Sequence, residues 1–374
     1  ASDILFLKYE NKKIENKSDM ANAFNDFFTN VGPKLDKDIP KVKKPNCEKL
    51  YLKSRVLQSF LISPTDQNEV IEIIDSLDES KSTSSHSIPI KLIKIAKHEI
   101  LIPLVDICNS SFSQGCFPSK NKLAEVIPIH KDGPTEDVTN YRPISLLPAF
   151  SKIMEKLMAK RLSTFLELHS ILFPKQFGFR SGYSTTHSLI DIVETIRHSL
   201  DNKKFGCGLF IDLKKAFDTV NHEFLWKVLH KYGILEAMIN AICRVYEDFY
   251  LIFTVGEAEE HILYTIGVHQ GDNLAPLLFL LFFQAAIDSL KKEWEREQIK
   301  CPEFKRFLDT QKGTPCGRLR GQGKANGKIF DFWKSLYADD GAFLFETRKD
   351  LEKGAKLIYW GAGHVSSRKA WPFL

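Results

Sequence analysis

Residues 334–345 read KSLYADDGAFLF, two apolar arms around a pair of adjacent aspartates. Because an Asp-Gly pair tolerates the positive φ of a tight turn, the pattern predicts a β-hairpin with Asp339, Asp340 and Gly341 at its tip. Three apolar side chains are expected to anchor the arms: Leu336, Phe343 and Phe345. Neighbouring carboxylates repel each other, and a bound cation would offset that repulsion. Asp-Asp-Gly is also a common turn, so the hairpin indicates a metal site only together with a second carboxylate-bearing element.

A further aspartate lies upstream, at the end of the apolar run FGCGLFI (205–211). Such a run is typical of a strand buried on both faces, and it stops at Asp212. Catalysis with two divalent cations requires carboxylates that converge from separate elements. Mg²⁺ prefers hard oxygen ligands, and a few aspartates on rigid strands suffice to hold it. Asp212 with Asp339 and Asp340 is such a donor set, although a strand-ending aspartate is also a common cap.

The bulk composition is that of a globular protein. The 374 residues are 43% hydrophobic and 26% charged, which excludes disordered and collagen-like chains. The net charge of +5 fits a polyanionic partner but is shared by many ordinary enzymes. Seven cysteines without a C-x-x-C pair argue against a disulfide framework or a zinc ribbon. The most apolar run, 274–287, is shorter than a membrane span of roughly 18 residues, so we expect no contact with membranes.

Periodicity outlines the remaining elements. Helical spacing is present at 20–32, 63–77, 90–96, 100–113, 149–169 and 222–231, and a buried helix is expected after Pro276. Extended segments are expected at 124–131, 140–147, 250–255 and 261–268, the last two as paired strands around an acidic turn. Two basic stretches without apolar periodicity, 34–48 and the Gly-rich 309–328, are predicted to be solvated loops.

Three stretches occur in an order typical of one family: FIDLKKAFDTVNH (210–222), GVHQGDNLAPLLFLLF (267–282) and LYADDGAFLF (336–345). They resemble the palm motifs of reverse transcriptases of non-LTR (LINE-like) retrotransposons. Three upstream stretches resemble the finger motifs: VIPIHK (126–131), NYRPISLL (140–147) and QFGFRSGYSTTHSL (176–189). FNDFFTNVG (24–32) resembles the linker that follows the endonuclease domain of that family. The resemblance covers about residues 20–359.

The resemblance implies an α+β chain with the right-hand polymerase fold, in which a ferredoxin-like antiparallel palm sheet packs on helices. The expected domains are a helical N-terminal linker or extension (1–120), fingers (121–200) and a palm (201–359) with a basic Gly-rich insertion at about 301–332. Residues 360–374 show neither helical nor strand periodicity and are expected to be an aberrant or disordered tail. We therefore expect the thumb to be missing. The start at Ala1, without a methionine, suggests a piece of a longer polyprotein.

The resemblance also assigns the site residues. Asp212, Asp339 and Asp340 match the catalytic, metal-binding aspartates of the family. Phe217 matches the aromatic gate that excludes a 2′-hydroxyl, although a plain core role is an alternative. Gln270 and Gly271 match a turn that approaches the incoming nucleotide and the template. In much of the family a proline precedes this pair; here it is His269.

Basic residues form a further group of candidates. Arg142 and Arg180 match finger positions that would meet triphosphate or template phosphates, and a structural salt bridge is the alternative for each. Three lysines are candidates for contact with the nucleic-acid backbone: Lys131, Lys214 and Lys215.

The function expected from the resemblance is that of a retrotransposon reverse transcriptase. It would transfer dNTPs onto the 3′-hydroxyl of a DNA primer along an RNA template, with two Mg²⁺ ions, or Mn²⁺ in their place. The expected location is intracellular, in the nucleus, and the oligomeric state is open. One alternative is a catalytically inactive remnant that binds nucleic acid, and another is an RNA-dependent RNA polymerase. Without a thumb to clamp the duplex, we expect weak and poorly processive activity.

Overall fold

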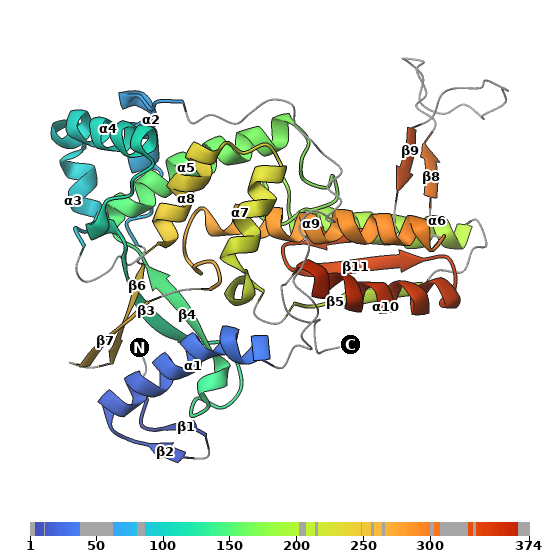
Figure 1. Ribbon diagram of the computed structural model, residues 1–374, viewed down its shortest axis with the longest axis horizontal. Helices are drawn as coiled ribbons and strands as arrows, with labels where there is room; N and C mark the ends of the chain where they lie inside the picture. The colour runs from blue at the N-terminus through green and yellow to red at the C-terminus, as the bar shows by residue number, and fades with distance from the viewer. Residues whose placement is uncertain are drawn as a thin grey trace. The chain divides into compact units, whose positions relative to one another are not determined.

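The computed structural model describes the following stretches: 4–10, 12–37, 63–80, 87–201, 207–213, 216–247, 249–255, 258–263, 266–299, 303–306, 328–331 and 334–365. Contacts divide the chain into two compact units. Unit 1 comprises Ala1–Phe173, Lys214–Ser289 and Trp360–Phe373. Unit 2 comprises Pro174–Leu213, Leu290–Tyr359 and Leu374. Figure 1 labels the elements of both units in chain order.

Unit 1 contains most of the helices and two sheets. Its helices are α1 (Lys17–Lys37), α2 (Gln67–Asp75), α3 (Ile90–Ile95), α4 (Lys97–Gln114), α5 (Ala149–Leu168), α7 (His222–Lys231), α8 (Glu236–Tyr246) and most of α9 (Ala275–Arg296). Its strands are β1 (Leu7–Tyr9), β2 (Lys12–Ile14), β3 (Leu123–His130), β4 (Tyr141–Leu146), β6 (Tyr250–Val255) and β7 (Ala258–Leu263).

The larger sheet of unit 1 has the strand order β4-β3-β6-β7. β3 runs antiparallel to β4 and parallel to β6, with Ala124 opposite Leu251. Its core joins residues far apart in the chain: Leu7, Met20, Phe24, Ala124, Val126, Val138, Tyr141, Leu147, Phe249 and Leu251. The ring of Phe24 on α1 meets that of Tyr141 on β4 edge to face, with centroids 5.0 Å apart. The amphipathic face of α1 therefore packs on the sheet.

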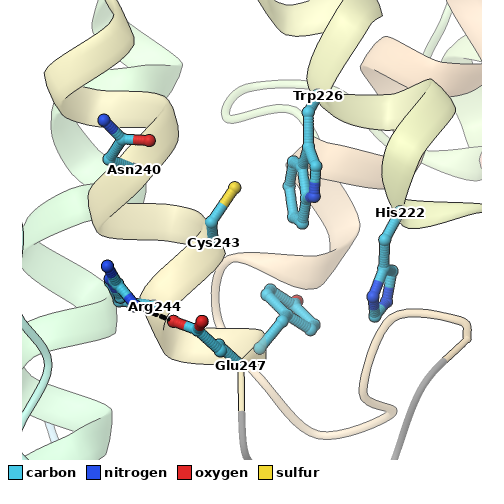
Figure 2. A pocket seen from close by; sticks show the side chains of 7 residues that line it. His222, Trp226, Asn240, Cys243, Arg244 and Glu247 are labelled. Carbon is cyan, nitrogen blue, oxygen red and sulfur yellow. Dashed lines mark hydrogen bonds and ion pairs between the residues drawn. The ribbon is translucent and has the colours of Figure 1, made fainter.

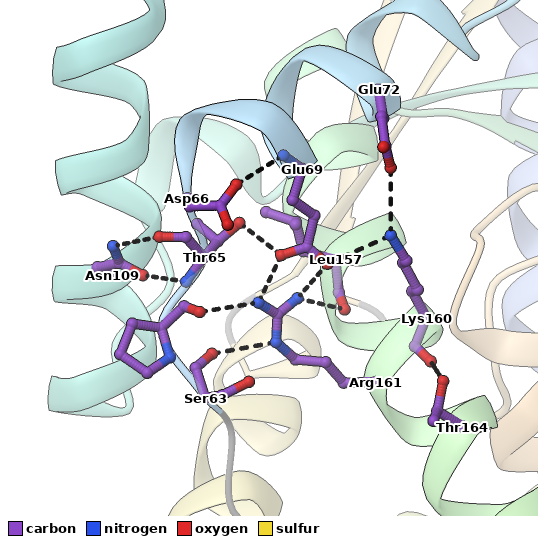
Figure 3. Close-up of polar contacts among 11 residues, drawn as sticks. Ser63, Thr65, Asp66, Glu69, Glu72, Asn109, Leu157, Lys160, Arg161 and Thr164 are labelled. Atoms are coloured by element: carbon purple, nitrogen blue, oxygen red, sulfur yellow. Dashed lines mark hydrogen bonds and ion pairs between the residues drawn. The ribbon is translucent and has the colours of Figure 1, made fainter.

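A partly buried ion pair joins α2 to α5 in unit 1 (Figure 3). Arg161 of α5 makes two bonds to the carboxylate of Glu69 on α2, 2.7 Å from Nη2 to Oε2 and 3.1 Å from Nη1 to Oε1. The same guanidinium donates to the backbone oxygens of Ser63, Pro64 and Leu157. Because every donor direction of this planar group is used, Arg161 holds the chain before α2 against α5.

The start of α2 differs from the sequence prediction, which began the helix at Ser63. The side chain of Asn109 on α4 accepts from the backbone N–H of Thr65 and donates to its carbonyl, at 2.7 and 3.0 Å. These bonds occupy both backbone groups of Thr65, and the extended backbone of Asp66 follows it (φ -117°, ψ 175°). Asp66 then caps the helix by accepting from the N–H of Glu69.

Unit 2 is built on a three-stranded antiparallel sheet with the order β10-β11-β5. Its strands and helices are α6 (Thr185–Asp201), β5 (Cys207–Ile211), β8 (Glu303–Arg306), β9 (Lys328–Asp331), β10 (Lys334–Tyr337), β11 (Asp340–Phe345), the end of α9, and α10 (Arg348–Val365) up to Tyr359. α6 packs against β10, and the hydroxyls of Ser188 and Ser335 lie 3.0 Å apart between them. A Cβ on Gly354 would lie 2.3 Å from Cε1 of Phe345, so glycine allows α10 to approach that ring.

Several sequence predictions agree with this fold. The helices expected at 90–96, 100–113, 149–169 and 222–231 are α3, α4, α5 and α7, and the helix expected after Pro276 is α9. The extended segments at 124–131 and 140–147 are β3 and β4. β6 and β7 pair as expected, but β7 spans Ala258–Leu263 and not 261–268, so Glu259 and Glu260 lie in the strand and not in a turn.

Other predictions were wrong or concern residues outside the described part of the chain. β5 is not buried on both faces, because Gly208 and Phe210, which alternate on one face, are exposed, Phe210 to 68%. α10 continues to Val365, beyond the point where regular structure was expected to end. The basic stretch at 309–328 lies outside the described residues except for Lys328, which opens β9. Among the described helices, none combines the length and apolar character needed to cross a membrane.

Candidate active site

The hairpin of β10 and β11 is present, but its turn is one residue earlier than predicted. Tyr337 pairs with Asp340, so Ala338 and Asp339 form the two-residue loop. The residue with positive φ is Ala338, at +57°, and not a residue of the Asp-Gly pair. Gly341 lies inside β11 opposite Leu336. Its arms are anchored as expected by Leu336, Phe343 and Phe345, all at most 2% exposed.

The sheet of unit 2 brings two of the predicted carboxylates next to each other. β5 pairs antiparallel with β11, with Ile211 opposite Gly341. Continuing this register by one residue sets Asp212 opposite Asp340, where cross-strand side chains are typically about 5 Å apart. Burial, and then the charge of Asp212, raises the pKa of Asp340 above its ordinary value. Asp339, the third carboxylate, directly precedes Asp340 in the loop.

The chemistry of these side chains fits a divalent cation. Within the described part of the chain, no three His, Cys, Asp or Glu side chains stand close enough to form a ready metal site. Burial, and then the charge of Asp212, favours the neutral form of Asp340, and a cation between the two carboxylates would offset their mutual repulsion. Carboxylate oxygens are hard ligands of the kind that Mg²⁺ and Mn²⁺ bind. The assignment of these aspartates as metal ligands stays a prediction.

Arg180 lies in the segment before α6, also in unit 2. Its guanidinium carbon is 4.5 Å from the ring centroid of Tyr183, and Nη1 donates to the backbone oxygen of Gln176 at 3.1 Å. These contacts give Arg180 a structural role in the finger-like motif. They involve a stacked ring and a carbonyl; the salt bridge that was the alternative for this residue stays a prediction. Its contact with phosphates stays a prediction.

The predicted Gln270-Gly271 turn belongs to unit 1. The backbone oxygen of Gln270 accepts from the N–H of Ser145, at 2.9 Å, which ties the turn to β4. Gly271 has a φ of +112°, and a Cβ there would lie 2.6 Å from the oxygen of Ser145. Both the conformation and the space therefore require glycine. The side-chain amide of Gln270 donates to Asp218 at 3.1 Å.

Phe217 is held by the same loop of unit 1. Its backbone oxygen accepts from the N–H of Val268 at 2.8 Å. Its half-buried ring stacks on Phe279 of α9, with centroids 4.9 Å apart and planes 16° from parallel. One face of the ring is thus a core contact, in line with the alternative reading. The role as a sugar gate stays a prediction.

The remaining basic candidates are divided between the sheet of unit 1 and residues outside the described part. Arg142 is exposed on β4, opposite Ile129 of β3. Lys131 directly follows β3 and is exposed as well. Lys214 and Lys215 lie outside the described residues. Exposure of Arg142 and Lys131 is compatible with contact to a phosphate backbone, which stays a prediction.

A buried pair of carboxyl groups lies beside the Gln270-Gly271 turn, and the sequence did not predict this pair. Asp272 follows Gly271 and accepts from the Tyr246 hydroxyl at 2.9 Å and from the N–H of Leu274 at 2.6 Å. Glu155 of α5 lies next to Asp272 and accepts from the Ser151 hydroxyl at 2.8 Å. Burial raises the pKa of both groups, and the charge of Asp272 raises that of Glu155 further. Burial and the neighbouring charge therefore favour the protonated form of Glu155. The lone signal in the sequence is a glutamate on an otherwise apolar helix face.

Next to this turn, α7 and α8 enclose a pocket of about 380 Å³ (Figure 2). It is lined by His222, Trp226, Asn240, Cys243, Arg244, Tyr246 and Glu247. The His222 ring bonds through Nε2 to the oxygen of Gly267, at 2.6 Å. Burial lowers the pKa of His222, although this bond to Gly267 opposes the shift. Because a carbonyl oxygen can only accept, Nε2 is the donor in this bond. Sequence reasoning did not single out these residues as a site.

A carboxylate hairpin paired with a strand that leads into another aspartate, in a chain of mixed helices and strands, is the arrangement expected of a polymerase palm. The chain belongs to the reverse transcriptase (RNA-dependent DNA polymerase) family, whose model matches residues 129–360. That match contains every predicted site residue, from Arg142 to Asp340. The family implies the palm and fingers of a polymerase, and its members generally use divalent metal ions.

Similar proteins come from mobile elements. "Probable RNA-directed DNA polymerase from transposon BS" of Drosophila melanogaster is 33% identical over 62% of this chain and 26% of its own length. "RNA-directed DNA polymerase from mobile element jockey" of the same species is 31% identical over 62% of this chain and 25% of its own. A polyprotein of the retrotransposable element R2 from Popillia japonica is 32% identical over 43% and 22%. The chain thus spans about a quarter of the length of these relatives.

Proposed function

We propose that this chain is the catalytic part of an RNA-directed DNA polymerase from a non-LTR retrotransposon. It would join dNTPs to the 3′-hydroxyl of a DNA primer along an RNA template. The observation that carries the proposal is the register of β5 and β11, which sets Asp212 opposite Asp340 in a family that copies RNA into DNA. We assign the fingers to about residues 121–200 and the palm to 201–359, with the antiparallel sheet of unit 2 as support. We further propose that the protein acts in the nucleus, on chromosomal DNA ends.

Each site residue has a stated task in this mechanism. Asp212, Asp339 and Asp340 would hold two Mg²⁺ ions. When bound, these ions would lower the pKa of the attacking hydroxyl and neutralise the triphosphate. The glycine at 271 would let the backbone of its turn approach the nucleotide and template, and Gln270 would contact them. Phe217 would exclude a 2′-hydroxyl.

Basic residues complete the proposed substrate site. Arg142 and Arg180 would meet triphosphate or template phosphates. Such contacts add affinity that falls with salt but carry no sequence information. The chemistry in this mechanism lies in positioning and charge and needs no covalent intermediate.

Primer extension tests the proposal. The chain is incubated with an RNA template, a labelled DNA primer, dNTPs and Mg²⁺, and Asp339→Ala serves as the inactive control. We expect incorporation that requires the metal and drops by about 1,000-fold or more in the control. Nucleic-acid binding without incorporation would support the inactive remnant instead. Equal use of ribonucleotides, unchanged by Phe217→Ala, would support an RNA polymerase.

A further inference from the structure

The hairpin that carries Asp339 and Asp340 contains a residue in an unfavourable conformation. Ala338 has a φ of +57°, in the left-handed region that a Cβ disfavours. It forms the loop together with Asp339 and is 5% exposed. A non-glycine residue keeps such a backbone when its surroundings over-determine it, and such residues are frequent at functional sites.

One side chain, Gln176, satisfies both backbone groups of Ala338. The Ala338 N–H donates to Oε1 of Gln176 at 2.9 Å, and Nε2 of Gln176 donates to the Ala338 oxygen at 3.1 Å. Oε1 also accepts from the N–H of Gly178 at 2.9 Å. Gln176 is 3% exposed, so these are buried bonds that water does not replace.

The backbone around Gln176 is fixed against the same hairpin. Phe177 donates its N–H to the oxygen of Leu336 at 2.8 Å, and Leu336 donates to Lys175 at 2.9 Å. A Cβ on Gly178 would lie 2.1 Å from the nitrogen of Ala338, so the two backbones are in direct contact. The amide of Gln176 is therefore brought to Ala338 by a rigid strand-like segment.

These contacts define the orientation of two peptide planes. The N–H of Ala338 belongs to the peptide that follows Tyr337, and its oxygen belongs to the peptide that leads into Asp339. A single planar amide that binds both groups fixes both planes at once. Because Asp340 follows directly, the directions of both carboxylate side chains depend on these planes.

We propose that Gln176 is a positioning residue for the carboxylates of the catalytic hairpin. It holds the left-handed turn at Ala338 and thereby sets the direction of Asp339 and Asp340. This inference rests on the proposed function, since it gives those carboxylates a role that requires positioning. A carboxamide is suited to the task because it offers one donor and one acceptor in a plane.

Hydrogen exchange tests the contact without any catalysis. In the full chain, Gln176→Met keeps the length and removes both bonds, and Gln176→Asn keeps the amide but shortens its reach. We expect amides of the hairpin at 338–340 to exchange at least about tenfold faster in both variants. Gln284→Met is the matched control, because Gln284 is another buried glutamine that accepts from a backbone N–H, that of Phe173, and donates to Asp288. It should leave hairpin exchange unchanged.

The kinetics of primer extension distinguish a positioning role of Gln176 from a general effect on the stability of the chain. We expect Gln176→Met to lower kcat of primer extension by about 100-fold with little change in the KM for template-primer. Adding Ala338→Gly relieves the backbone strain, because glycine accepts a positive φ. It should recover the thermal stability of the Gln176→Met chain while kcat stays low.

Three results would overturn the role of Gln176. The first is hairpin exchange at the wild-type rate in both variants, and the second is full recovery of kcat together with stability in the double variant. The third is complete unfolding of both variants that Ala338→Gly does not reverse, since the role would then be global. A wild-type chain that makes no DNA would instead contradict the proposed function. Hydrogen exchange of the hairpin amides would still test whether Gln176 holds the turn.

Discussion

At the scale of single residues, the sequence identified the charged groups but not the conformations that hold them. The aspartates at 212, 339 and 340 were recognised because their flanking apolar arms are local patterns. The left-handed residue was assigned to the Asp-Gly pair on turn preference, whereas the structure has it at Ala338. The reason is tertiary, because the amide of Gln176 lies more than 160 residues away in the chain and satisfies Ala338. No local rule contains such a contact.

Cys243 provides a prediction on a single side chain. Burial, and then the charges of Glu236 and Glu247, raises the pKa of its thiol to about 11. Since the thiolate is the nucleophile, alkylation by iodoacetamide at pH 8 should be at least about tenfold slower than that of a free cysteine. Mass spectrometry of the Cys243 peptide over time measures the rate. The same peptide in urea is the control, and equal rates in the folded and unfolded chain would contradict the prediction.

The buried pair of Glu155 and Asp272 predicts a dependence of stability on pH. The pKa of Glu155 lies well above its ordinary 4.5 in the folded chain, mainly because of burial. Its stabilising contribution is therefore complete below pH 4.5 and is lost as the pH rises through the raised value. We expect Glu155→Gln, which is always neutral, to flatten the fall in the free energy of unfolding as the pH rises above about 4.5. An equally steep fall in the variant, measured by urea unfolding, would be the contrary result.

At the scale of elements, periodicity was most reliable where helices and strands are long and their packing is regular. α5 and α7 agree with their predicted bounds to within one residue. Boundaries failed where another element satisfies the backbone, as Asn109 does at Thr65 before α2. The prediction that β5 is buried on both faces failed because an apolar composition does not reveal whether both faces of a strand are covered.

The contacts of Arg161 predict that this side chain stabilises the packing of α2 against α5. Its side chain is 9% exposed and bonded to Glu69, so Arg161→Ala leaves a poorly solvated carboxylate. We expect a loss of about 3 kcal/mol in the free energy of unfolding. Arg244→Ala is the matched control, because Arg244 and Glu247 form an exposed pair that should contribute less than about 1 kcal/mol. Similar losses in both variants, by urea unfolding, would show that the network in Figure 3 adds little.

The close contact at Gly271 predicts that the Gln270-Gly271 turn does not tolerate a larger side chain. Gly271→Ala adds a Cβ at 2.6 Å from the Ser145 oxygen at a φ of +112°, so the turn must move. We expect kcat/KM for dNTPs to fall by about 100-fold. Gly182→Ala separates strain from contact, because Gly182 has a φ of +79° but nothing within 4 Å of a Cβ. A decrease of similar size in both variants would mean that the approach to Ser145 does not matter.

At the scale of the whole molecule, the family could be predicted from the sequence, and the match over residues 129–360 confirms it. The predicted palm residues are divided between the units: the aspartates belong to unit 2, whereas Phe217, Gln270 and Gly271 belong to unit 1. The motifs are contiguous in sequence and therefore easy to recognise. The supporting groups Gln176, Glu155 and Asp272 gain their roles through long-range contacts, and the sequence alone did not single them out.

The central claim is that Asp212, Asp339 and Asp340 hold the catalytic cations together. Anomalous diffraction from crystals grown with Mn²⁺, primer-template and a non-reactive dNTP analogue tests it most directly, because Mn²⁺ scatters where it binds. We predict manganese peaks within about 2.2 Å of carboxylate oxygens of Asp212 and of the hairpin aspartates. Manganese bound elsewhere, with the carboxylate of Asp212 making no contact to it, would contradict the account.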